Sequence, residues 1–509
     1  MDERITDKLE NGDKVLSGMP YLYRSKGMPS LVYDVRMRKE INHEILNRAI
    51  EDALLRYPYF GVKFEERDGD FYAVRNEQPL EARNIDGFIP LGGHSNNYHL
   101  MSVTYWDKSL KLSFHHGLTD GRGAKTFLEQ IVKFYSDYDG ADIDRYEEVK
   151  TAHLEIAREL KYEEFYDPCE EKHRIDGKSE KIDGLVSKGY TLSETANIGS
   201  HRRYEIGFSQ QEYMDACRKI EASPLIYLSM LMSRGIKEAC PECDKPIVTN
   251  FAVDARAILG CESSFKNCVK SMTFPYGEKQ ELMEDAALAA EYKRLLNAQR
   301  DYAHCAKEFN NINMFLGVIG HFHSFASRQK LLGFMDNLKR DTYLISYVGR
   351  FDLPEELVEE VHLYSNGSNG IVLNMTCVSG RFVIDVVQDF ETDRYITALI
   401  EQFEKAEIAT KVSEEILFET PYDELSEIIT SKADTGEKIS NWFEKVKAAA
   451  KASTETAKER AKAAENMGRP VKELYYDVTS GSMKEFDPTE NVSEELQKIV
   501  RATPSIFMK

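Results

Sequence analysis

The sequence predicts an α/β protein of two lobes with a helical extension at its C-terminus. An alternation of strands and amphipathic helices runs through residues 1–190 and starts again in residues 191–412. Beyond about Val412 the composition shifts toward Ala, Lys and Glu. With 509 residues the chain is long enough for two or three compact units. We therefore expect an N-terminal lobe, a C-terminal lobe and a helical, partly irregular extension over residues 413–509.

The elements of the first lobe follow from periodicity and turn signals. Residues 30–37 alternate as a strand, and residues 42–56 carry apolar side chains at helical spacing until Tyr57-Pro58 stops the helix. Hairpins are expected around Asp68-Gly69 and Asp107-Lys108. Further segments are a helix over residues 121–138 and a polar, charged stretch over residues 140–188 that favours a helical insertion and a crossover.

The second lobe repeats the mixed order without a residue-level repeat. Its helices are expected over residues 223–239, where Pro follows the first residue, and over residues 393–409. Its strands are expected over residues 246–256, 344–351, 371–378 and 381–387.

The extension contains one amphipathic segment. Its apolar stripe occupies only the first half of an Ala/Lys/Glu helix over residues 437–466 and consists of Ile439, Trp442, Phe443 and Val446. We expect this stripe to dock on the body of the protein. A partner-binding helix is an alternative, and a membrane-surface helix is disfavoured because its mixed charge lacks a basic face. The last forty residues are expected to be irregular.

Composition and charge exclude several classes of function. The chain is 42% hydrophobic and 30% charged, which is typical of a globular protein. Its net charge of −20 argues against general binding to nucleic acid or anionic membranes, because phosphate contacts need clustered Lys and Arg. The start, MDERITDKLENGDKV, lacks the features of a signal peptide, and no apolar run is long enough for a membrane span. We expect a soluble cytoplasmic protein.

The eight cysteines do not form a recognisable framework. Their irregular spacing is typical of reduced thiols in a cytosolic protein. Cys240 and Cys243 lie two residues apart within Cys-Pro-Glu-Cys, but the second pair, Cys261 and Cys268, has a spacing that fits no zinc site. We therefore interpret Cys240 to Cys243 as a turn between a helix and a strand, and we expect no metal site.

The most informative segment is residues 115–121, HHGLTDG, at a predicted junction between a strand and a helix. A neutral imidazole is the natural general base near pH 7, and an acidic residue four positions on, followed by Gly, can lock the turn that presents it. Leu110, Leu112 and Phe114 share the apolar face of the preceding strand. If the alternation continues, His116 and not His115 points inward. We predict His116 as the base.

HHGLTDG resembles the HHxxxDG signature of the thioester-dependent acyltransferase superfamily, which includes chloramphenicol acetyltransferase and peptide-synthetase condensation domains. The chain is most similar to the free-standing bacterial, alcohol-acetyltransferase-like branch, through FHHGLTDGRGA, through VDARAILGCESSFKN at Val253 to Asn267, and through SYVGRFDLPEE at Ser346 to Glu356. The resemblance covers roughly Pro20 to Lys411. It implies two chloramphenicol-acetyltransferase-like α/β sandwich subdomains that form a V-shaped pseudo-dimer, with His116 midway along a solvent channel.

The resemblance also implies roles for other residues. Asp120 is expected to pair with an arginine, for which Arg256 matches best, and to hold the turn. Gly117 and Gly121 are expected to permit backbone conformations or close packing, while His115 supports the turn. Tyr347 and Gly349 align with a second motif, but the sequence there is Tyr-Val-Gly-Arg-Phe instead of Asp-Phe-Gly-Trp-Gly, so that motif's role is not carried over. Candidates for stabilising an oxyanion are Ser346, Tyr347 and Asn374, among which the sequence does not choose.

These considerations predict an acyltransferase that uses an external acyl thioester and a small alcohol or amine. Acyl-CoA is the first expectation for the donor, as a co-substrate and not as a tightly bound cofactor. Its phosphates could meet His201-Arg202-Arg203 or Lys266 and Lys270, and the same patches could attract an acidic acyl carrier protein. The alternatives are a carrier-protein-dependent condensation enzyme and a catalytically idle scaffold whose C-terminal helix recruits a partner. Acyl chain, acceptor and oligomeric state are not encoded in these motifs.

Overall fold

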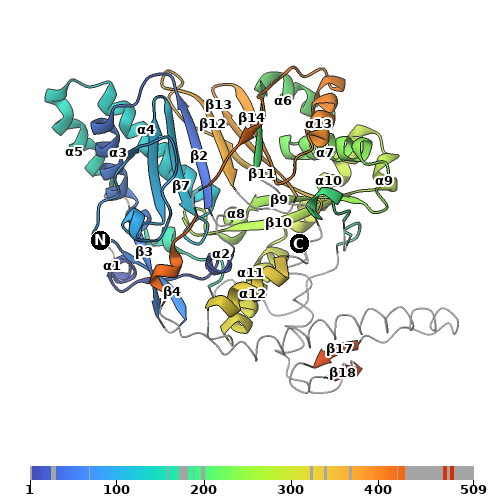
Figure 1. Ribbon diagram of the computed structural model, residues 1–509, viewed down its shortest axis with the longest axis horizontal. Helices are drawn as coiled ribbons and strands as arrows, with labels where there is room; N and C mark the ends of the chain where they lie inside the picture. The colour runs from blue at the N-terminus through green and yellow to red at the C-terminus, as the bar shows by residue number, and fades with distance from the viewer. Residues whose placement is uncertain are drawn as a thin grey trace.

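The computed structural model describes residues 3–24, 30–67, 69–157, 160–170, 182–186, 189–196, 201–320, 325–336, 341–365, 370–420, 422–429, 474–477 and 482–485. Two α/β lobes lie side by side, and their largest sheets meet in the middle of the molecule (Figure 1). The α/β fold class predicted from the sequence is confirmed. The termini of the described body lie on the surface, so the interior is built from the two lobes and the seam between them.

The N-terminal lobe is built on a five-stranded sheet in the order β12-β2-β7-β6-β5. The neighbours β2, β7 and β6 pair in antiparallel fashion, and the predicted hairpin around Asp107-Lys108 joins β6 to β7. The predicted strand over residues 30–37 is confirmed, with the same bounds. The strands of this sheet are β2 (Ser30–Met37), β5 (Arg83–Asn84), β6 (Met101–Trp106), β7 (Ser109–His115) and β12 (Val358–Ser365).

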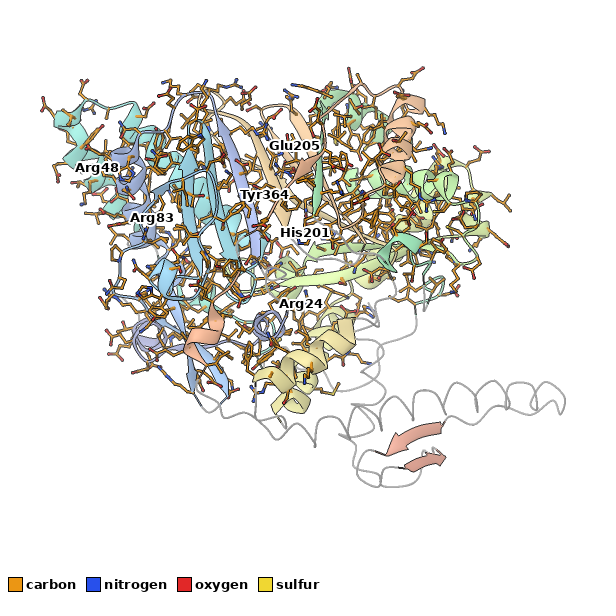
Figure 2. All side chains as sticks on the ribbon, viewed as in Figure 1. Arg24, Arg48, Arg83, His201, Glu205 and Tyr364 are labelled. Carbon is orange, nitrogen blue, oxygen red and sulfur yellow. The ribbon has the colours of Figure 1, made fainter. Side chains whose placement is uncertain are left out.

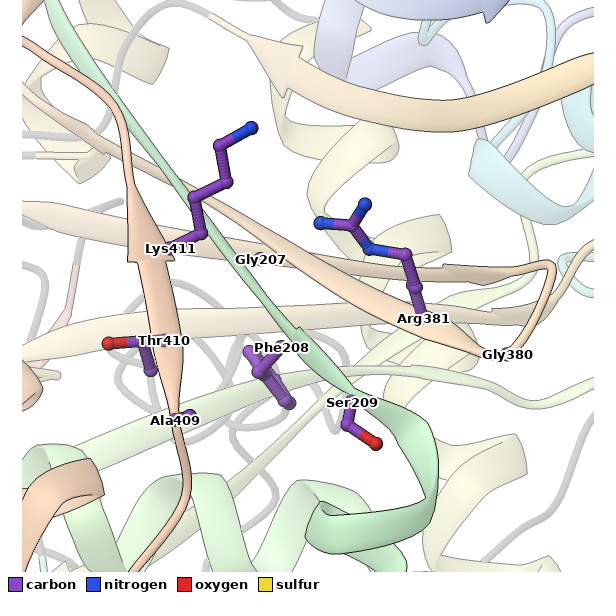
Figure 3. Close-up of a pocket in the computed structure, with 8 residues that line it drawn as sticks. All are labelled: Gly207, Phe208, Ser209, Gly380, Arg381, Ala409, Thr410 and Lys411. Carbon is purple, nitrogen blue, oxygen red and sulfur yellow. The ribbon is translucent and has the colours of Figure 1, made fainter.

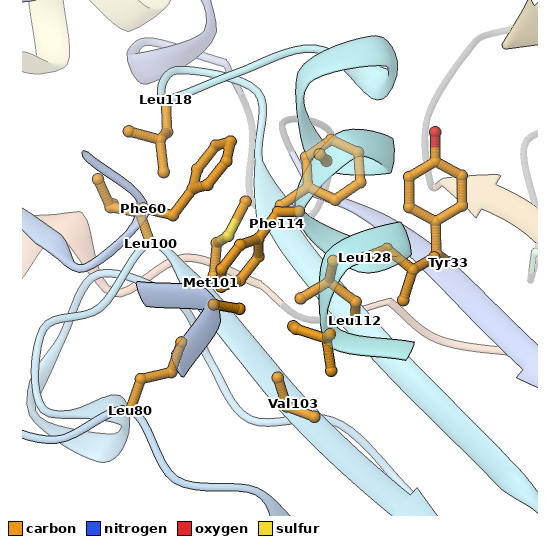
Figure 4. Close-up of a cluster of buried hydrophobic side chains, with 14 of the residues drawn as sticks. Tyr33, Phe60, Leu80, Leu100, Met101, Val103, Leu112, Phe114, Leu118 and Leu128 are labelled. Atoms are coloured by element: carbon orange, nitrogen blue, oxygen red, sulfur yellow. The ribbon is translucent and has the colours of Figure 1, made fainter. Parts of the chain in front are cut away.

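Helices α3 (His43–Arg56), α4 (Gly121–Asp139) and α5 (Tyr146–Ala157) cover the outer face of this sheet (Figure 1). Asn42 caps α3 by accepting hydrogen bonds from the N–H groups of Glu44 and Ile45. Leu112 and Phe114 of β7 pack with Leu128 of α4 in a continuous apolar core (Figure 4). Burial of this core fixes the junction between β7 and α4, where the HHGLTDG segment lies.

A smaller layer lies below the N-terminal lobe. It is the antiparallel sheet β1-β4-β3, made of β1 (Asp13–Lys14), β4 (Asp70–Arg75) and β3 (Val62–Arg67). The predicted hairpin at Gly69 is therefore confirmed. Helices α1 (Glu3–Glu10) and α2 (Met19–Leu22) lie close to it, and α2 is the element that approaches the HHGLTDG turn.

The C-terminal lobe is built on an eight-stranded sheet in the order β10-β9-β11-β13-β14-β8-β15, with β16 also paired to β8. Every side chain of β13 is buried, because helices cover one face of the sheet and the N-terminal lobe covers part of the other. The strands are β8 (Arg202–Ser209), β9 (Ile247–Asp254), β10 (Val269–Tyr276), β11 (Tyr343–Arg350), β13 (Ile371–Val378), β14 (Arg381–Gln388), β15 (Thr410–Val412) and β16 (Ile416–Leu417).

Helices α6, α7, α9, α10 and α13 gather on the side away from the N-terminal lobe, whereas α8 lies in the middle of the molecule and α11 and α12 lie below it (Figure 1). Helix α7 begins at Pro224 behind the cap Ser223, whose hydroxyl accepts a hydrogen bond from the N–H of Ile226. The helices are α6 (Gln210–Lys219), α7 (Pro224–Ala239), α8 (Arg256–Leu259), α9 (Glu278–Glu281), α10 (Asp285–Gln299), α11 (Tyr302–Gly320), α12 (Phe325–Asp336) and α13 (Arg394–Lys405).

Two segments cross from the C-terminal half of the sequence to the N-terminal lobe. Strand β12 pairs with β2 along its whole length, so the lobes predicted as residues 1–190 and 191–412 share a strand. Beyond Val412, β16 pairs with β8, Leu91 bridges to Asp423, and Leu425 is fully buried in the N-terminal core. We call residues 413–429 the strap. Because the strap packs on both lobes, the folded part of the protein continues beyond Val412.

The rest of the extension is described only at one hairpin. Strands β17 (Leu474–Asp477) and β18 (Ser482–Glu485) pair with each other, so the expectation of an irregular tail is wrong for these residues. The predicted helix with Ile439, Trp442, Phe443 and Val446 lies outside the described residues. Among the described helices, none combines the length and the apolar composition that a membrane span needs.

Replacing Leu425 with Ala tests the strap. The side chain is 0% exposed, so we expect Leu425→Ala to lower the free energy of unfolding by about 2–5 kcal/mol through lost burial and a cavity. The matched control is Leu417→Ala on β16, where the side chain is 62% exposed and the loss should stay within about 0.5 kcal/mol. Urea unfolding measures both. Equal losses in the two variants would show that the strap is not docked.

Candidate active site

The HHGLTDG segment forms a tight turn between β7 and α4. Strand β7 ends at His115, and α4 begins at Gly121 behind the cap Asp120. His115 is fully buried, while His116 lies in the turn and stays partly exposed. The prediction that His116 continues the apolar face of β7 is therefore wrong, because the alternation stops where the strand stops. It is the turn, and not the strand, that presents His116.

The imidazole of His116 is oriented by a hydrogen-bond contact at its Nδ1 atom. Nδ1 lies 3.0 Å from the carbonyl oxygen of Thr119. A carbonyl only accepts hydrogen bonds, so this contact favours the tautomer with the proton on Nδ1 and the lone pair on Nε2. In that tautomer the Asn267 amide donates to the His116 carbonyl and not to Nδ1. Among the described residues none forms a hydrogen bond with Nε2. The ring of Tyr21 stacks on the imidazole, with 4.3 Å between ring centroids and 24° between planes.

Asn267 is a neighbour of His116 that the sequence did not single out. Its Nδ2 lies 3.0 Å from Nδ1 and donates to the carbonyl oxygen of His116 at 3.1 Å. Its Oδ1 accepts a hydrogen bond from the N–H of Val269 at 3.3 Å. Asn267 therefore ties the main chain of the motif to β10 of the other lobe. One asparagine at the end of the SSFKN run gives no periodic signal, so only the structure identifies it.

The surroundings of His116 keep its ring neutral. Burial lowers the pKa of His116 to about 4, and Arg24 adds to this effect, whereas Asp120 and the Thr119 carbonyl oppose it. Burial also lowers the pKa of His115 to about 3. At neutral pH both rings are uncharged. His116 is thus entirely in the form that can accept a proton.

Asp120 and Arg256 are in contact, with 2.9 Å between Oδ1 and Nη2. Both side chains are buried, with exposures of 0% and 4%. Oδ1 also accepts the N–H of Gly123 and Oδ2 that of Cys268, at 2.9 and 2.8 Å. Burial alone would raise the pKa of Asp120, but Arg256 and these N–H groups hold it below its ordinary value. Both carboxylate oxygens of Asp120 are therefore occupied by structural contacts, and the side chain caps α4.

The guanidinium of Arg256 is equally occupied. It donates to the carbonyl oxygens of Ser264 and Lys266, both at 2.7 Å, and to Oδ1 of Asp254 at 2.9 Å. These groups belong to the C-terminal lobe, whereas Asp120 belongs to the N-terminal lobe. The Asp120–Arg256 pair consequently joins the loop between β9 and β10 to the motif turn.

The glycines and the first histidine of the motif pack closely. Nδ1 of His115 accepts the N–H of Gly117 at 2.9 Å, and a Cβ on Gly117 would lie 2.8 Å from that nitrogen. A Cβ on Gly18 would overlap the carbonyl oxygen of Gly117. At Gly121 a Cβ would lie 3.0 Å from Cγ1 of Val348. Any side chain at Gly117 or Gly18 would push α2 away from the turn.

The four tentative channel or oxyanion residues, Ser346, Tyr347, Gly349 and Asn374, lie on β11 and β13. Ser346 and Asn374 are direct neighbours across the ladder, and the Asn374 Nδ2 is buried without a partner among the described residues. Tyr347 points to the opposite face, toward Phe382 at 6.1 Å. Gly349 has φ of +83° at the bulge between Tyr347 and Arg350, so its role is conformational. None of the four forms a hydrogen bond with His116 in the described part of the chain.

The cationic side chains suggested for an anionic donor already have partners within the protein, including His201, which contacts Asp389. Lys266 is buried against Asp13, with 2.6 Å between the charged atoms, and the ammonium of Lys270 donates to the carbonyl of Gln299 at 2.8 Å. Arg202 pairs with Glu415, and Arg203 is buried. The partners of Lys266, Lys270 and Arg202 are distant in sequence, so the clustering of these cations along the chain did not reveal that they are occupied.

A second polar cluster lies where the lobes meet, and Figure 2 marks it at Glu205 and Tyr364. Glu205, His362 and Asp385 could group around a metal ion. However, Oε1 of Glu205 already contacts Arg36 at 2.6 Å and Arg203 at 2.9 Å. Burial disfavours charge on His362, yet Asp385 and the neighbouring glutamates raise its pKa to about 9. These contacts form an ion network that joins β12 to β8 and β14.

An open hollow of about 430 Å³ lies elsewhere on the C-terminal lobe (Figure 3). Gly207 leaves room between the side chains of Arg381 and Lys411, which stand on the flanking strands β14 and β15. No residue of the HHGLTDG segment lines it. The hollow is therefore separate from His116.

No protein-family model matches the chain, and no curated protein matches it in sequence. Among solved structures the chain is similar to polyketide synthase associated protein 5 from Mycobacterium tuberculosis, with 13% identity and a TM-score of 0.49 over 76% of this chain and 96% of that chain. It is similar to F. sporotrichioides TRI101 complexed with coenzyme A and T-2, with 11% identity and a TM-score of 0.49 over 78% and 99%. It is also similar to the condensation domain from monacolin K polyketide synthase MokA, with 10% identity and a TM-score of 0.48 over 77% and 96%.

Replacing Asp120 with Ala tests the pair between the lobes. The change removes the buried carboxylate partner of Arg256 and leaves only the partly exposed Asp254, so we expect a loss of about 3–5 kcal/mol in the free energy of unfolding at pH 7. The matched control is Asp254→Ala, which removes the 42% exposed partner of the same guanidinium and should cost at most about 1 kcal/mol. Because the pKa of folded Asp120 is lowered, its contribution is present above the ordinary value of 3.8 and is lost as the pH falls.

Denaturant unfolding at pH 7 and at pH 3 measures these differences. The gap between wild type and Asp120→Ala should narrow at the lower pH. A gap that stays constant, or an equal cost for the two aspartates, would contradict the role of the buried pair.

Proposed function

We propose that the chain is an acyltransferase that moves an acyl group from a thioester to an alcohol or an amine, with His116 as the general base. The observation that carries the proposal is the state of the His116 ring. Its Nδ1 is bound to the Thr119 carbonyl, it is neutral at pH 7, and its Nε2 has no hydrogen-bond partner among the described residues. A positioned imidazole of this kind is suited to carrying one proton in each direction.

The proposed reaction needs two transfers of the same proton. As the acceptor oxygen or nitrogen attacks the thioester carbonyl carbon, its proton moves to Nε2 of His116. When the tetrahedral intermediate collapses, the carbon–sulfur bond breaks and the departing thiolate takes the proton from Nε2. The ester or amide and the free thiol are the products. An imidazolium with a low pKa returns its proton readily, which favours the second transfer.

This arrangement differs from a triad of nucleophile, histidine and carboxylate. Asp120 directs both oxygens to Arg256, Gly123 and Cys268, and among the described residues no carboxylate forms an ion pair with the His116 ring. The ring is oriented by a backbone carbonyl, so the protein makes no covalent acyl intermediate in our proposal. His116 acts directly on the acceptor.

The donor and the oxyanion stabiliser are the less defined parts of the proposal. We propose acyl-CoA as the donor, bound as a co-substrate, and a small alcohol or amine as the acceptor. Asn374 offers a buried Nδ2 without a partner among the described residues, and Ser346 lies next to it, so these two are the proposed oxyanion donors. The ring of Tyr347 lies against the C-terminal core, which makes Tyr347 the weaker candidate.

Release of free thiol from a panel of acyl-CoAs, with pooled alcohols and amines, tests the function. We expect wild type to release thiol in an acceptor-dependent manner and His116→Ala to be slower by about 10²–10⁴-fold. His43→Ala, which removes an exposed imidazole from the same lobe, should leave the rate unchanged. Asn374→Ala in the same assay should lose about 10–10³-fold.

The pH dependence gives an independent check. His116 acts in its neutral form, so kcat/KM should be level across pH 6–8 and fall only as the pH approaches about 4. Wild-type thiol release no faster than that of His116→Ala with every acyl-CoA would contradict the coenzyme A proposal. Repeating the assay with acyl carrier proteins then separates a carrier-dependent enzyme from an idle scaffold.

A further inference from the structure

Helix α2 is held against the catalytic turn by close packing. Gly18 precedes α2 and meets the backbone of Gly117 so closely that a Cβ on Gly18 would overlap the carbonyl oxygen of Gly117. Leu22 also lies on the turn, because a Cβ on Gly117 would come within 2.9 Å of its Cδ2. The adjoining Tyr23 is 1% exposed, and its hydroxyl accepts a hydrogen bond from Nη1 of Arg328 at 2.7 Å. These contacts fix α2 relative to His116.

From this fixed position α2 directs an aromatic ring onto His116. The Tyr21 ring lies almost parallel to the imidazole, with centroids 4.3 Å apart. The guanidinium carbon of Arg24 lies 4.7 Å from the centroid of the same tyrosine ring. Arg24, marked in Figure 2, lies in the middle of the molecule. Imidazole, phenol ring and guanidinium thus form one stacked group.

We propose that Tyr21 and Arg24 form a positioning arm that fixes the plane of the His116 ring and covers one of its faces. Tyr21 restricts rotation of the imidazole about its side-chain bonds and covers one of its faces. Arg24 places a positive charge near the ring, which opposes a second positive charge on the imidazole. Neither residue touches the reacting atoms in this proposal, so both act through His116.

The other charged groups around His116 do not duplicate this effect. Asp120 on the same turn acts in the opposite direction and favours the protonated ring. His115, the adjacent residue, is itself neutral and buried. Two residues of the C-terminal lobe contact the turn. Asn267 is uncharged, and the charge of Arg256 is paired with Asp120. Among the described residues, Arg24 is therefore the cation whose charge lowers the pKa of His116.

Titration of His116 by NMR tests the arm without depending on catalysis. In protein labelled with ¹³C on histidine, the His116 signal is assigned by its absence in His116→Gln, which separates it from the other eleven of the twelve histidines. We expect the pKa of His116 to rise from about 4 in Arg24→Gln, through loss of the charge, and in Tyr21→Leu, through weaker burial of the ring. In both variants it should stay below 6.5, because burial is the largest cause of the lowered pKa. Arg24→Lys and Tyr21→Phe, which keep the charge and the ring, should titrate like wild type.

The matched control is Arg48→Gln. Arg48 lies 5.4 Å from the ring of Tyr146 at the far side of the same lobe, so its loss removes a similar cation–aromatic contact without approaching His116 (Figure 2). The His116 titration should not change in this variant. An unchanged His116 pKa in both Arg24→Gln and Tyr21→Leu, or an equal shift in Arg48→Gln, would overturn the proposal.

A kinetic measurement tests whether the positioning arm affects catalysis. This part of the inference rests on the proposed function. Loss of ring positioning should lower kcat in Tyr21→Leu by on the order of tenfold, with KM little changed and with recovery in Tyr21→Phe. If wild type proves inactive with every thioester, the proposed function fails while the titration still decides the arm. If wild type is active and Tyr21→Leu keeps full kcat, the positioning role is refuted even where the titration shifts.

Discussion

The buried ion pair between Asp120 and Arg256 is the constraint on which the candidate site depends. It is a contact between lobes, and each partner also holds local backbone: Asp120 caps α4, and Arg256 closes the loop between β9 and β10. A buried pair of this kind is tolerable only because its remaining donors and acceptors are satisfied, which is the case on both sides. These hydrogen bonds offset the desolvation cost of the pair. They also hold the turn in one conformation.

Because the turn is fixed, the proposed general base is held without a carboxylate partner. His116 obtains its tautomer from the carbonyl of Thr119 and its main-chain anchor from Asn267 of the other lobe. Its ring plane is set by Tyr21. A second ion network, around His362 and Asp385, joins the lobes through β12. The two lobes consequently act as one unit, and separation of the lobes would dismantle the base.

The sequence predicted the larger elements well because each depends on local periodicity. The strand at residues 30–37, the helix expected over residues 42–56 and the strands at residues 371–378 and 381–387 follow directly from such patterns. The end of β7 at His115 was missed, since alternation alone does not show where a strand stops. The burial of Lys266 and the contact of Asn267 with His116 were also missed, because their partners are about 250 and 150 residues away. Pairing of Arg256 with Asp120 came from family resemblance and not from any local pattern.

The most direct test of the account is the protonation state of His116 in the resting protein. Two-dimensional NMR that correlates the imidazole nitrogens with the ring protons distinguishes the two neutral tautomers and the charged ring. At pH 7 we expect a neutral ring with the proton on Nδ1 and a lone pair on Nε2. A proton on Nε2 at neutral pH, whether in the other tautomer or in a charged ring, would contradict the assignment of His116 as the base.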